Sequence, residues 1–196
     1  RIPVGKRVLS PAATAADLIR HADDDARGYR IGAGHVHVRP TYIFVPDDGP
    51  VVAIDVAFLF ALPGGRGKDM LNTFLRKIAT DSDAHAGVFV SEAWARTVAK
   101  AGSTPASCWA GVESAKARLR ERPMNEEPDC REVILYSAEV RRPNGTIDRA
   151  KGVRPIKTVG GSEVGDLVIE PFRMGGPLDG ATRDLGFGIL ATKVAP

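Results

Sequence analysis

The stretch that decides the fold is EVILYSAEVRRPNGTIDRAKGVRPIK, residues 132–157. Its first part, residues 132–141, is a predicted strand with apolar side chains on both faces. The sequence Pro-Asn-Gly-Thr at residues 143–146 is a strong hairpin signal, because Asn and Gly readily adopt the positive φ angles of a tight turn. Residues 146–157 are therefore predicted to return antiparallel to the first strand.

Outward from this hairpin, hydrophobic periodicity predicts the other elements. Ser10 followed by Pro11 marks the start of a first helix, and Gly28 marks its end. The run at residues 51–60 is almost entirely apolar, which favours a central strand. The predicted helices span residues 11–27, 68–80 and 107–120, and the remaining strands span residues 35–39, 42–45, 51–60, 86–94, 166–172 and 187–192.

The order of these elements favours an α+β fold. Short turns join most of the strands, which predicts a mainly antiparallel sheet of about six strands with two or three helices on one face. The chain has 196 residues and is expected to form a single α+β domain over residues 1–160. Residues 161–196 are rich in Gly and Pro, and we expect a C-terminal extension packed on the domain or on a partner.

Composition and charge exclude several classes of protein. The chain is 43% hydrophobic and 26% charged, with a net charge of +3, which is ordinary for a soluble globular protein. Its 2 cysteines are too few for a disulfide scaffold, and it has no C-x-x-C motif of the kind that binds zinc. The longest apolar run, residues 51–62, is interrupted by Asp55 and is shorter than the roughly 20 residues of a membrane span. We expect a cytoplasmic protein, or a virion-associated one if a bacteriophage encodes it.

The hairpin carries a local excess of positive charge, with six basic residues and one acid, Asp148, between residues 141 and 157. Such a ribbon can bind the phosphates of nucleic acid, with an affinity that falls steeply as salt concentration rises. A solvated basic face is the alternative interpretation. The candidate anion-binding residues are Arg141, Arg142, Arg149, Lys151, Arg154 and Lys157.

Two histidines, His35 and His37, share one face of the predicted strand at residues 35–39. Neutral imidazoles at this spacing can chelate zinc. No third ligand follows at a spacing typical of a zinc site, so we expect no metal cofactor and regard both histidines as weak candidates. A metal-dependent hydrolase that combines them with Glu92, Asp129 and Glu132, which could converge near one end of the sheet, is an alternative hypothesis.

Four residues at strand ends are candidates for a structural or binding site. Glu92 and Trp94 end one predicted strand, and Asp129 and Glu132 lie at the start of the next. Glu92 shares its face of the strand with apolar side chains, where an unpaired carboxylate costs free energy. We therefore predict that Glu92 is at least half buried, and bonded to a basic side chain or to backbone amides near Asp129 and Glu132.

The glycine-rich sequence GGRGKD at residues 64–69 precedes a predicted helix, as a phosphate-binding loop does. The phosphate-loop pattern requires glycine where Leu62 stands and Ser or Thr where Asp69 stands. We therefore interpret this segment as a strand-to-helix turn.

The sequences VFVSEAW at residues 88–94 and PDCREVIL at residues 128–135 resemble a loose family of small uncharacterised bacterial and bacteriophage proteins with the pattern vfvSEaW…PDrrEvL. The resemblance covers about residues 10–160, and Cys130 stands where arginine is more usual. It implies one fold unit and a microbial or viral setting, and it implies no reaction.

No complete catalytic constellation is recognisable, and the G-x-S-x-G motif of a nucleophile elbow is absent. The leading hypothesis is a non-enzymatic accessory or assembly protein that acts through protein–protein contacts, with another protein or a second copy of the chain. Nucleic-acid binding through the basic hairpin is the first alternative, and metal-dependent hydrolysis is the second. We expect no cofactor and no membrane contact.

Overall fold

The hairpin is present in the computed structural model of the chain, which describes residues 13–32, 37–62, 66–96, 130–157, 163–172 and 188–190. Strand β4 (Cys130–Arg141) pairs antiparallel with β5 (Ile147–Pro155). In the turn between them, Gly145 adopts φ 81°. Asn144 Oδ1 accepts a hydrogen bond from the backbone N of Thr146 at 3.1 Å. The predicted hairpin and its turn are confirmed.

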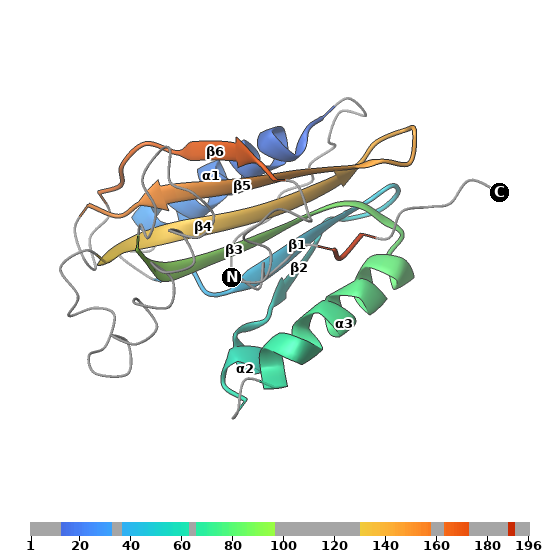
Figure 1. Ribbon diagram of the computed structural model, residues 1–196, viewed down its shortest axis with the longest axis horizontal. Coiled ribbons are helices and arrows are strands. Elements are labelled where there is room, and N and C mark those ends of the chain that lie inside the picture. The colour runs from blue at the N-terminus through green and yellow to red at the C-terminus, as the bar shows by residue number, and fades with distance from the viewer. Residues whose placement is uncertain are drawn as a thin grey trace, which may run out of the picture.

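The hairpin forms one side of a six-stranded antiparallel sheet with the order β2-β1-β3-β4-β5-β6 (Figure 1). Every neighbouring pair is antiparallel, and β2 and β6 are the edge strands. With its helices this sheet makes an α+β fold, which confirms the predicted class. The other strands are β1 (Thr41–Pro46), β2 (Val52–Asp55), β3 (Ala84–Arg96) and β6 (Val168–Pro171).

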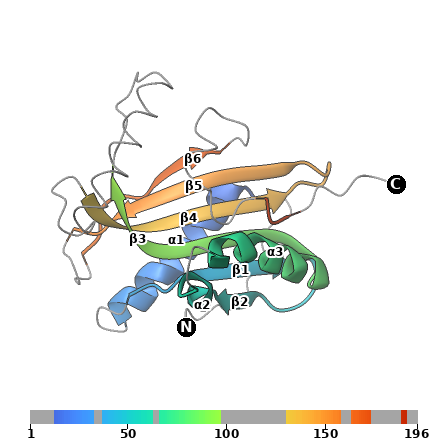
Figure 2. The ribbon, with the colours of Figure 1, turned by 60° about the horizontal axis from the view of Figure 1, so that its bottom comes forward.

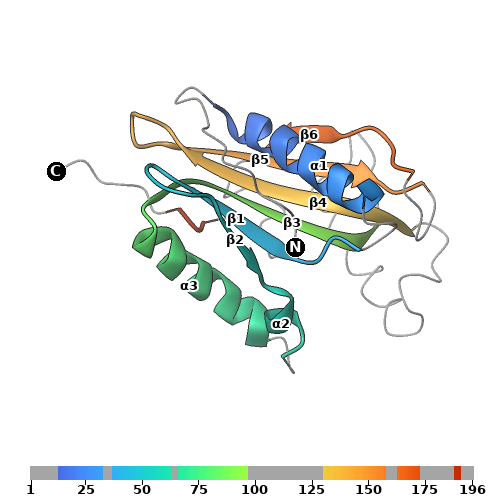
Figure 3. The ribbon, with the colours of Figure 1, turned by 180° about the vertical axis from the view of Figure 1, so that it is seen from behind.

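The two long helices cover opposite faces of the sheet, so the expectation that the helices share one face is wrong. Helix α1 (Ala15–Gly32) packs on the face that carries Val88 and Val90 of β3 (Figure 3). Helix α3 (Arg66–Asp81) packs on the other face, where Phe89 is buried (Figure 2). Because successive strand residues point to opposite faces, a central strand that is apolar at every position needs a cover on both sides.

The apolar run at residues 51–60 is not a central strand, and this prediction is wrong. It forms the edge strand β2 and then the short helix α2 (Ala57–Phe60). Asp55 Oδ1 accepts a hydrogen bond from the backbone N of Ala57 at 2.9 Å, which helps to turn the chain out of the strand. Leu59 is buried in the core beneath α3. An apolar run of this length does not distinguish a strand from a buried helical turn.

Helix α1 differs from the predicted helix at both ends. It begins at Ala15, after a capping box in which the backbone N of Asp17 donates to Thr14 Oγ1 at 3.0 Å and the backbone N of Thr14 donates to Asp17 Oδ2 at 2.9 Å. Gly28 lies inside the helix rather than at its end. Ser10 and Pro11 lie outside the described residues.

Of the other predicted elements, the helix at residues 68–80 and the strand at residues 86–94 are confirmed as α3 and β3. The strand predicted at residues 166–172 is the shorter β6. Of the last strand predicted, at residues 187–192, the structure describes residues 188–190. These residues form no strand, and Ile189 and Leu190 are buried beneath α3. The helix predicted at residues 107–120 lies outside the described residues. Among those that are described, no helix combines the length and the apolar character of a membrane span.

Candidate functional site

Glu92 lies in a buried polar cluster between the sheet and α1. Its side chain is 7% exposed, and its Oε1 is ion-paired with Nη1 of Arg30, which is 1% exposed. Its Oε2 lies 2.6 Å from Nδ1 of His37. The prediction that Glu92 is buried and bonded to a basic side chain is therefore confirmed. The partner is on α1, because residue 92 faces that helix.

Glu132 joins this cluster through the pairing of β3 with β4. Glu92 lies opposite Ile134, and Trp94 lies opposite Glu132, so the two acids are diagonal neighbours on the face covered by α1. Glu132 Oε1 is 3.7 Å from His37 Nδ1. Its Oε2 is buried and has no hydrogen-bond partner among the described residues. Trp94 is half-buried, and Asp129 lies outside the described residues.

His37, Glu92 and Glu132 together could hold a metal ion. One ligand atom from each lies within 4.8 Å of the other two. Histidine nitrogen and carboxylate oxygen are both ligands of divalent transition metals. The metal-dependent hydrolase hypothesis combined His35 and His37 with Glu92, Asp129 and Glu132. The structure brings His37, Glu92 and Glu132 together through the register of β3 and β4, whereas His35 and Asp129 lie outside the described residues.

Sequence analysis did not identify Arg30 as part of the cluster. The predicted helix ended before it, whereas α1 continues to Gly32 and carries Arg30 to the sheet. Leu18, Ala22 and Ala26 of α1 are buried on the sheet side, and Arg30 follows Ala26 by four residues, one turn further on. Extending this apolar spacing past Gly28 would have placed Arg30 against the sheet.

The six basic residues of the hairpin do not form one ribbon. Arg142 pairs with Asp148 at 3.0 Å, Arg149 with Glu139 at 2.8 Å, Arg154 with Asp23 at 2.5 Å and Lys157 with Glu163 at 3.1 Å. Lys151 lies over the ring of Phe172, 4.2 Å from its centroid. Arg141, at the end of β4, is half-buried. Most of these charges are therefore committed to contacts within the fold, and they face both sides of the sheet.

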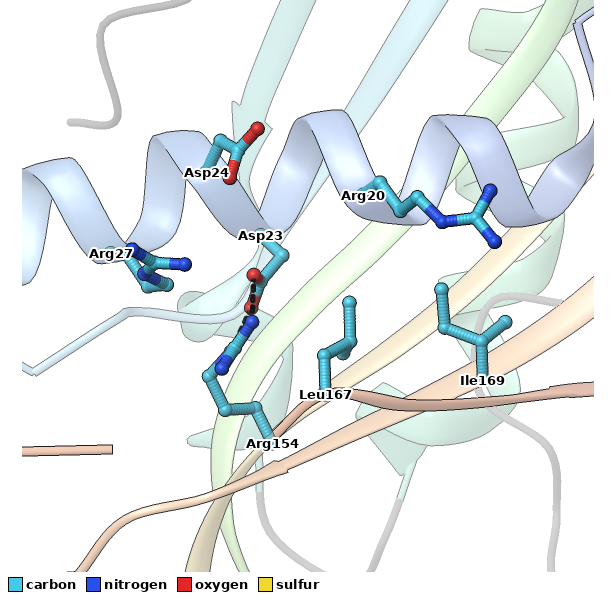
Figure 4. A pocket seen from close by; sticks show the side chains of 7 residues that line it. All are labelled: Arg20, Asp23, Asp24, Arg27, Arg154, Leu167 and Ile169. Carbon is cyan, nitrogen blue, oxygen red and sulfur yellow. Dashed lines mark hydrogen bonds and ion pairs between the residues drawn. The ribbon is translucent and has the colours of Figure 1, made fainter. Parts of the chain in front are cut away.

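A polar groove of about 480 Å³ lies between α1 and the segment around β6 (Figure 4). Arg154 reaches across it to Asp23, and Asp24 points away from this pair (Figure 4). The Tyr136 hydroxyl also donates to Asp23 Oδ1, at 2.8 Å. Burial, together with the Asp23 carboxylate, raises the pKa of Tyr136 far above its usual value. The groove is lined by Arg20, Asp23, Asp24, Arg27, Arg154, Leu167 and Ile169.

A second buried carboxylate, Glu139 on β4, holds the segment at residues 188–190 against the sheet. The carboxylate is fully buried and accepts hydrogen bonds from the backbone N atoms of Gly188, Ile189 and Leu190 at 2.7, 2.9 and 3.0 Å. Arg149 neutralises its charge. Glu139 is thus a structural anchor for this segment of the C-terminal extension.

The glycine-rich sequence at residues 64–69 runs into α3, which begins at Arg66, so Gly67 lies in the first turn of the helix. A Cβ atom on Gly67 would lie 1.5 Å from the carbonyl oxygen of Leu59. Only glycine therefore lets the first turn of α3 approach α2 this closely. The interpretation of residues 64–69 as a strand-to-helix turn is therefore wrong for residues 66–69, which are helical and follow α2 rather than a strand.

Helices α2 and α3 present an apolar surface to solvent at the lower edge of the molecule in Figure 1. Phe58 and Met70 are 55% and 54% exposed, and the rings of Phe58 and Phe74 meet edge to face with centroids 6.0 Å apart. Among the described residues, the one other exposed large apolar side chain is Val168 on β6. We define the α2–α3 surface by its exposed side chains, Phe58, Phe60, Leu62, Met70 and Phe74.

Comparison of the chain with protein-family models, with curated proteins and with solved structures finds no match.

Proposed function

We propose that this protein is a non-enzymatic assembly protein that binds a second copy of itself through the α2–α3 surface. The carrying observation is that five of the six exposed large apolar side chains in the described part of the chain lie on α2, on α3 or, for Leu62, just after α2. Contiguous exposed apolar patches on soluble proteins mark interaction sites. Phe58, Phe60 and Phe74 are aromatic, and aromatic side chains are enriched at protein interfaces.

The charges beside this surface are compatible with a second copy as its occupant. Along α3, the row that begins with Met70 and Phe74 continues at the same helical spacing with Lys77 and Asp81. Lys77 Nζ and Asp81 Oδ2 are 2.8 Å apart and form an ion pair. The row therefore carries one charge of each sign, and no net charge opposes the approach of an identical row. A symmetric dimer places the same patch on both sides of the interface.

The nucleic-acid alternative has weaker support from the geometry. Arg142, Arg149 and Arg154 are each paired with an acid inside the fold, so their charge is already compensated. Nucleic-acid binding would need these pairs to open. We therefore do not favour it over self-association.

Analytical ultracentrifugation of the full chain over a range of concentrations tests the proposal. We expect a monomer–dimer equilibrium that Phe58→Glu shifts strongly toward monomer, because the substitution buries a charge in the interface. Val168→Glu is the matched control, since Val168 is also 55% exposed but lies on β6. A chain that stays monomeric at high micromolar concentration would overturn the proposal. So would a dimer that Phe58→Glu and Val168→Glu affect equally.

A further inference from the structure

We propose that His37, Glu92 and Glu132 form a binding site for a divalent transition-metal cation, with zinc as the representative ion. The site is separate from the α2–α3 surface, because it lies on the face of the sheet covered by α1. It rests on three observations: the geometry of the ligand atoms, the burial of two acids, and an unpartnered carboxylate oxygen.

The ligand atoms lie at distances that one ion can bridge. His37 Nδ1 is 2.6 Å from Glu92 Oε2 and 3.7 Å from Glu132 Oε1. Zinc bonds of about 2.0–2.2 Å place tetrahedral ligand atoms roughly 3.3–3.6 Å apart. Small side-chain rotations close the difference, and His37 is free to make them because its side chain is 70% exposed.

The charge balance of the cluster favours a bound cation. Glu92 and Glu132 are both 7% exposed, and the buried guanidinium of Arg30 is paired with Glu92. Glu132 faces the cluster with Oε2 buried and without a hydrogen-bond partner in the described part of the chain. A buried carboxylate oxygen without a hydrogen-bond partner costs free energy. A divalent cation between the two acids would remove this cost.

The backbone and Arg30 hold the ligands in place. Arg30 binds one oxygen of Glu92 and leaves the other directed at His37, as outer-shell partners of metal-ligating carboxylates do. The backbone N of Glu92 donates to the carbonyl oxygen of Val38 at 3.1 Å, which fixes the chain next to His37. On the other side, the backbone N of Ile156 donates to the carbonyl oxygen of Glu132 at 2.9 Å. Two of the three ligands therefore lie on rigid strands.

The set of ligands indicates the class of ion. Magnesium and calcium prefer oxygen ligands alone, whereas an imidazole with two carboxylates suits zinc and its first-row neighbours. Three protein ligands leave a fourth position for water, as in zinc sites that are open to substrate. Arg30 is a positioning residue here and does not touch the ion.

Isothermal titration calorimetry of the chelator-treated full chain with ZnCl₂ tests the proposal. We expect one equivalent of zinc per chain, and a rise in melting temperature when zinc is present, because binding to the folded state stabilises it. His37→Ala and Glu132→Gln should each weaken binding by about tenfold or more. His37 is exposed, and glutamine keeps the shape of Glu132, so both variants should fold. Titration with CoCl₂ adds a spectroscopic signature, because bound cobalt absorbs visible light according to its coordination.

His21→Ala is the matched control, because His21 is an exposed histidine in the middle of α1. It should bind zinc and shift its melting temperature as the unaltered chain does. Absence of stoichiometric binding would overturn the proposal. Stoichiometric binding that His37→Ala and Glu132→Gln leave unchanged would also overturn it, because the ion would then occupy another site.

Discussion

Arg154 on β5 holds Asp23 on α1 through two parallel hydrogen bonds, from Nε to Oδ1 at 2.6 Å and from Nη2 to Oδ2 at 2.5 Å. Tyr136 donates to the same carboxylate, and Arg154 also donates from Nη1 to the carbonyl oxygen of Gly165 at 2.5 Å. Asp23 is 2% exposed, so water has little access to its carboxylate. The groups of this network therefore obtain their hydrogen bonds from one another. This network ties α1 to two strands and to the segment before β6.

Replacement of Asp23 tests how strongly this network stabilises the fold. Asp23→Ala leaves a buried guanidinium and a buried hydroxyl without their acceptor, so the free energy of unfolding should fall by about 3 kcal/mol or more. Asp24→Ala is the control, because Asp24 is exposed and points away from Arg154. Urea unfolding of both variants measures the difference. Equal stability of the two would show that the network contributes nothing.

Replacement of Glu92 tests the buried pair with Arg30. Glu92→Ala should lower the free energy of unfolding by about 3 kcal/mol, because it leaves Arg30 buried without its acid. Glu92→Gln should cost less, since it keeps the shape and one acceptor oxygen. Glu170→Ala, on the exposed side of the edge strand β6, should change stability little. Thermal melts of the three variants compare these effects, and an unchanged melt for Glu92→Ala would contradict a structural role for the pair.

Two helical glycines should respond to alanine in opposite directions. Gly67→Ala should destabilise the fold, because its Cβ would meet the carbonyl oxygen of Leu59 at 1.5 Å and the two helices would have to move apart. Gly28→Ala should stabilise it by about 0.5–1 kcal/mol, since no atom lies within 4 Å of that Cβ and alanine favours the helix. Denaturant midpoints of both variants provide the measurement. A gain in stability for Gly67→Ala would contradict the close approach of α2 and α3.

Two of the three tyrosines should ionise only when the chain unfolds. Burial raises the pKa of Tyr42 well above its usual value, with a further contribution from Glu139. Burial, with a smaller contribution from the Asp23 carboxylate, likewise raises the pKa of Tyr136. Because both pKa values are raised in the folded chain, the stability that the two neutral tyrosines contribute is fully present below about pH 10. It is lost as the pH rises further, because only the unfolded chain releases the protons.

The free energy of unfolding should therefore fall by about 1.4 kcal/mol per pH unit for each of these tyrosines above pH 10. Phenolate absorbance followed together with circular dichroism measures both events. Ionisation of all three tyrosines while the circular dichroism remains native would contradict the prediction. Tyr136→Phe should remove one of the two contributions to the slope.

Local sequence was sufficient for the elements whose signals are local. The Asn144–Gly145 turn and its flanking strands follow from the φ angles that these two residues permit. Helix α3 follows from apolar residues at a helical period, and β3 from an apolar run of strand length. Glu92 was predictable as a buried, paired acid, because the period of two places it beside Val90 on an apolar face.

Local signals were insufficient where two structures satisfy the same pattern. The apolar segment at residues 51–60 serves equally as a strand or as a strand followed by a helical turn, and packing beneath α3 selects the second. Gly28 is a helix end by preference, yet α1 continues through it to Gly32 and carries Arg30 to its ion pair with Glu92.

By itself, the sequence determined which residue types stand on which face of β3 and β4 and where the hairpin turns. Only the tertiary structure decided that His37, Glu92 and Glu132 meet, because their distance depends on the register between β3 and β4 and on the path of the chain into β1. It likewise decided that the basic residues of the hairpin are paired with acids from α1 and β4. Side-chain periodicity is a property of neighbouring residues, whereas the convergence of charges follows from packing between segments distant in sequence.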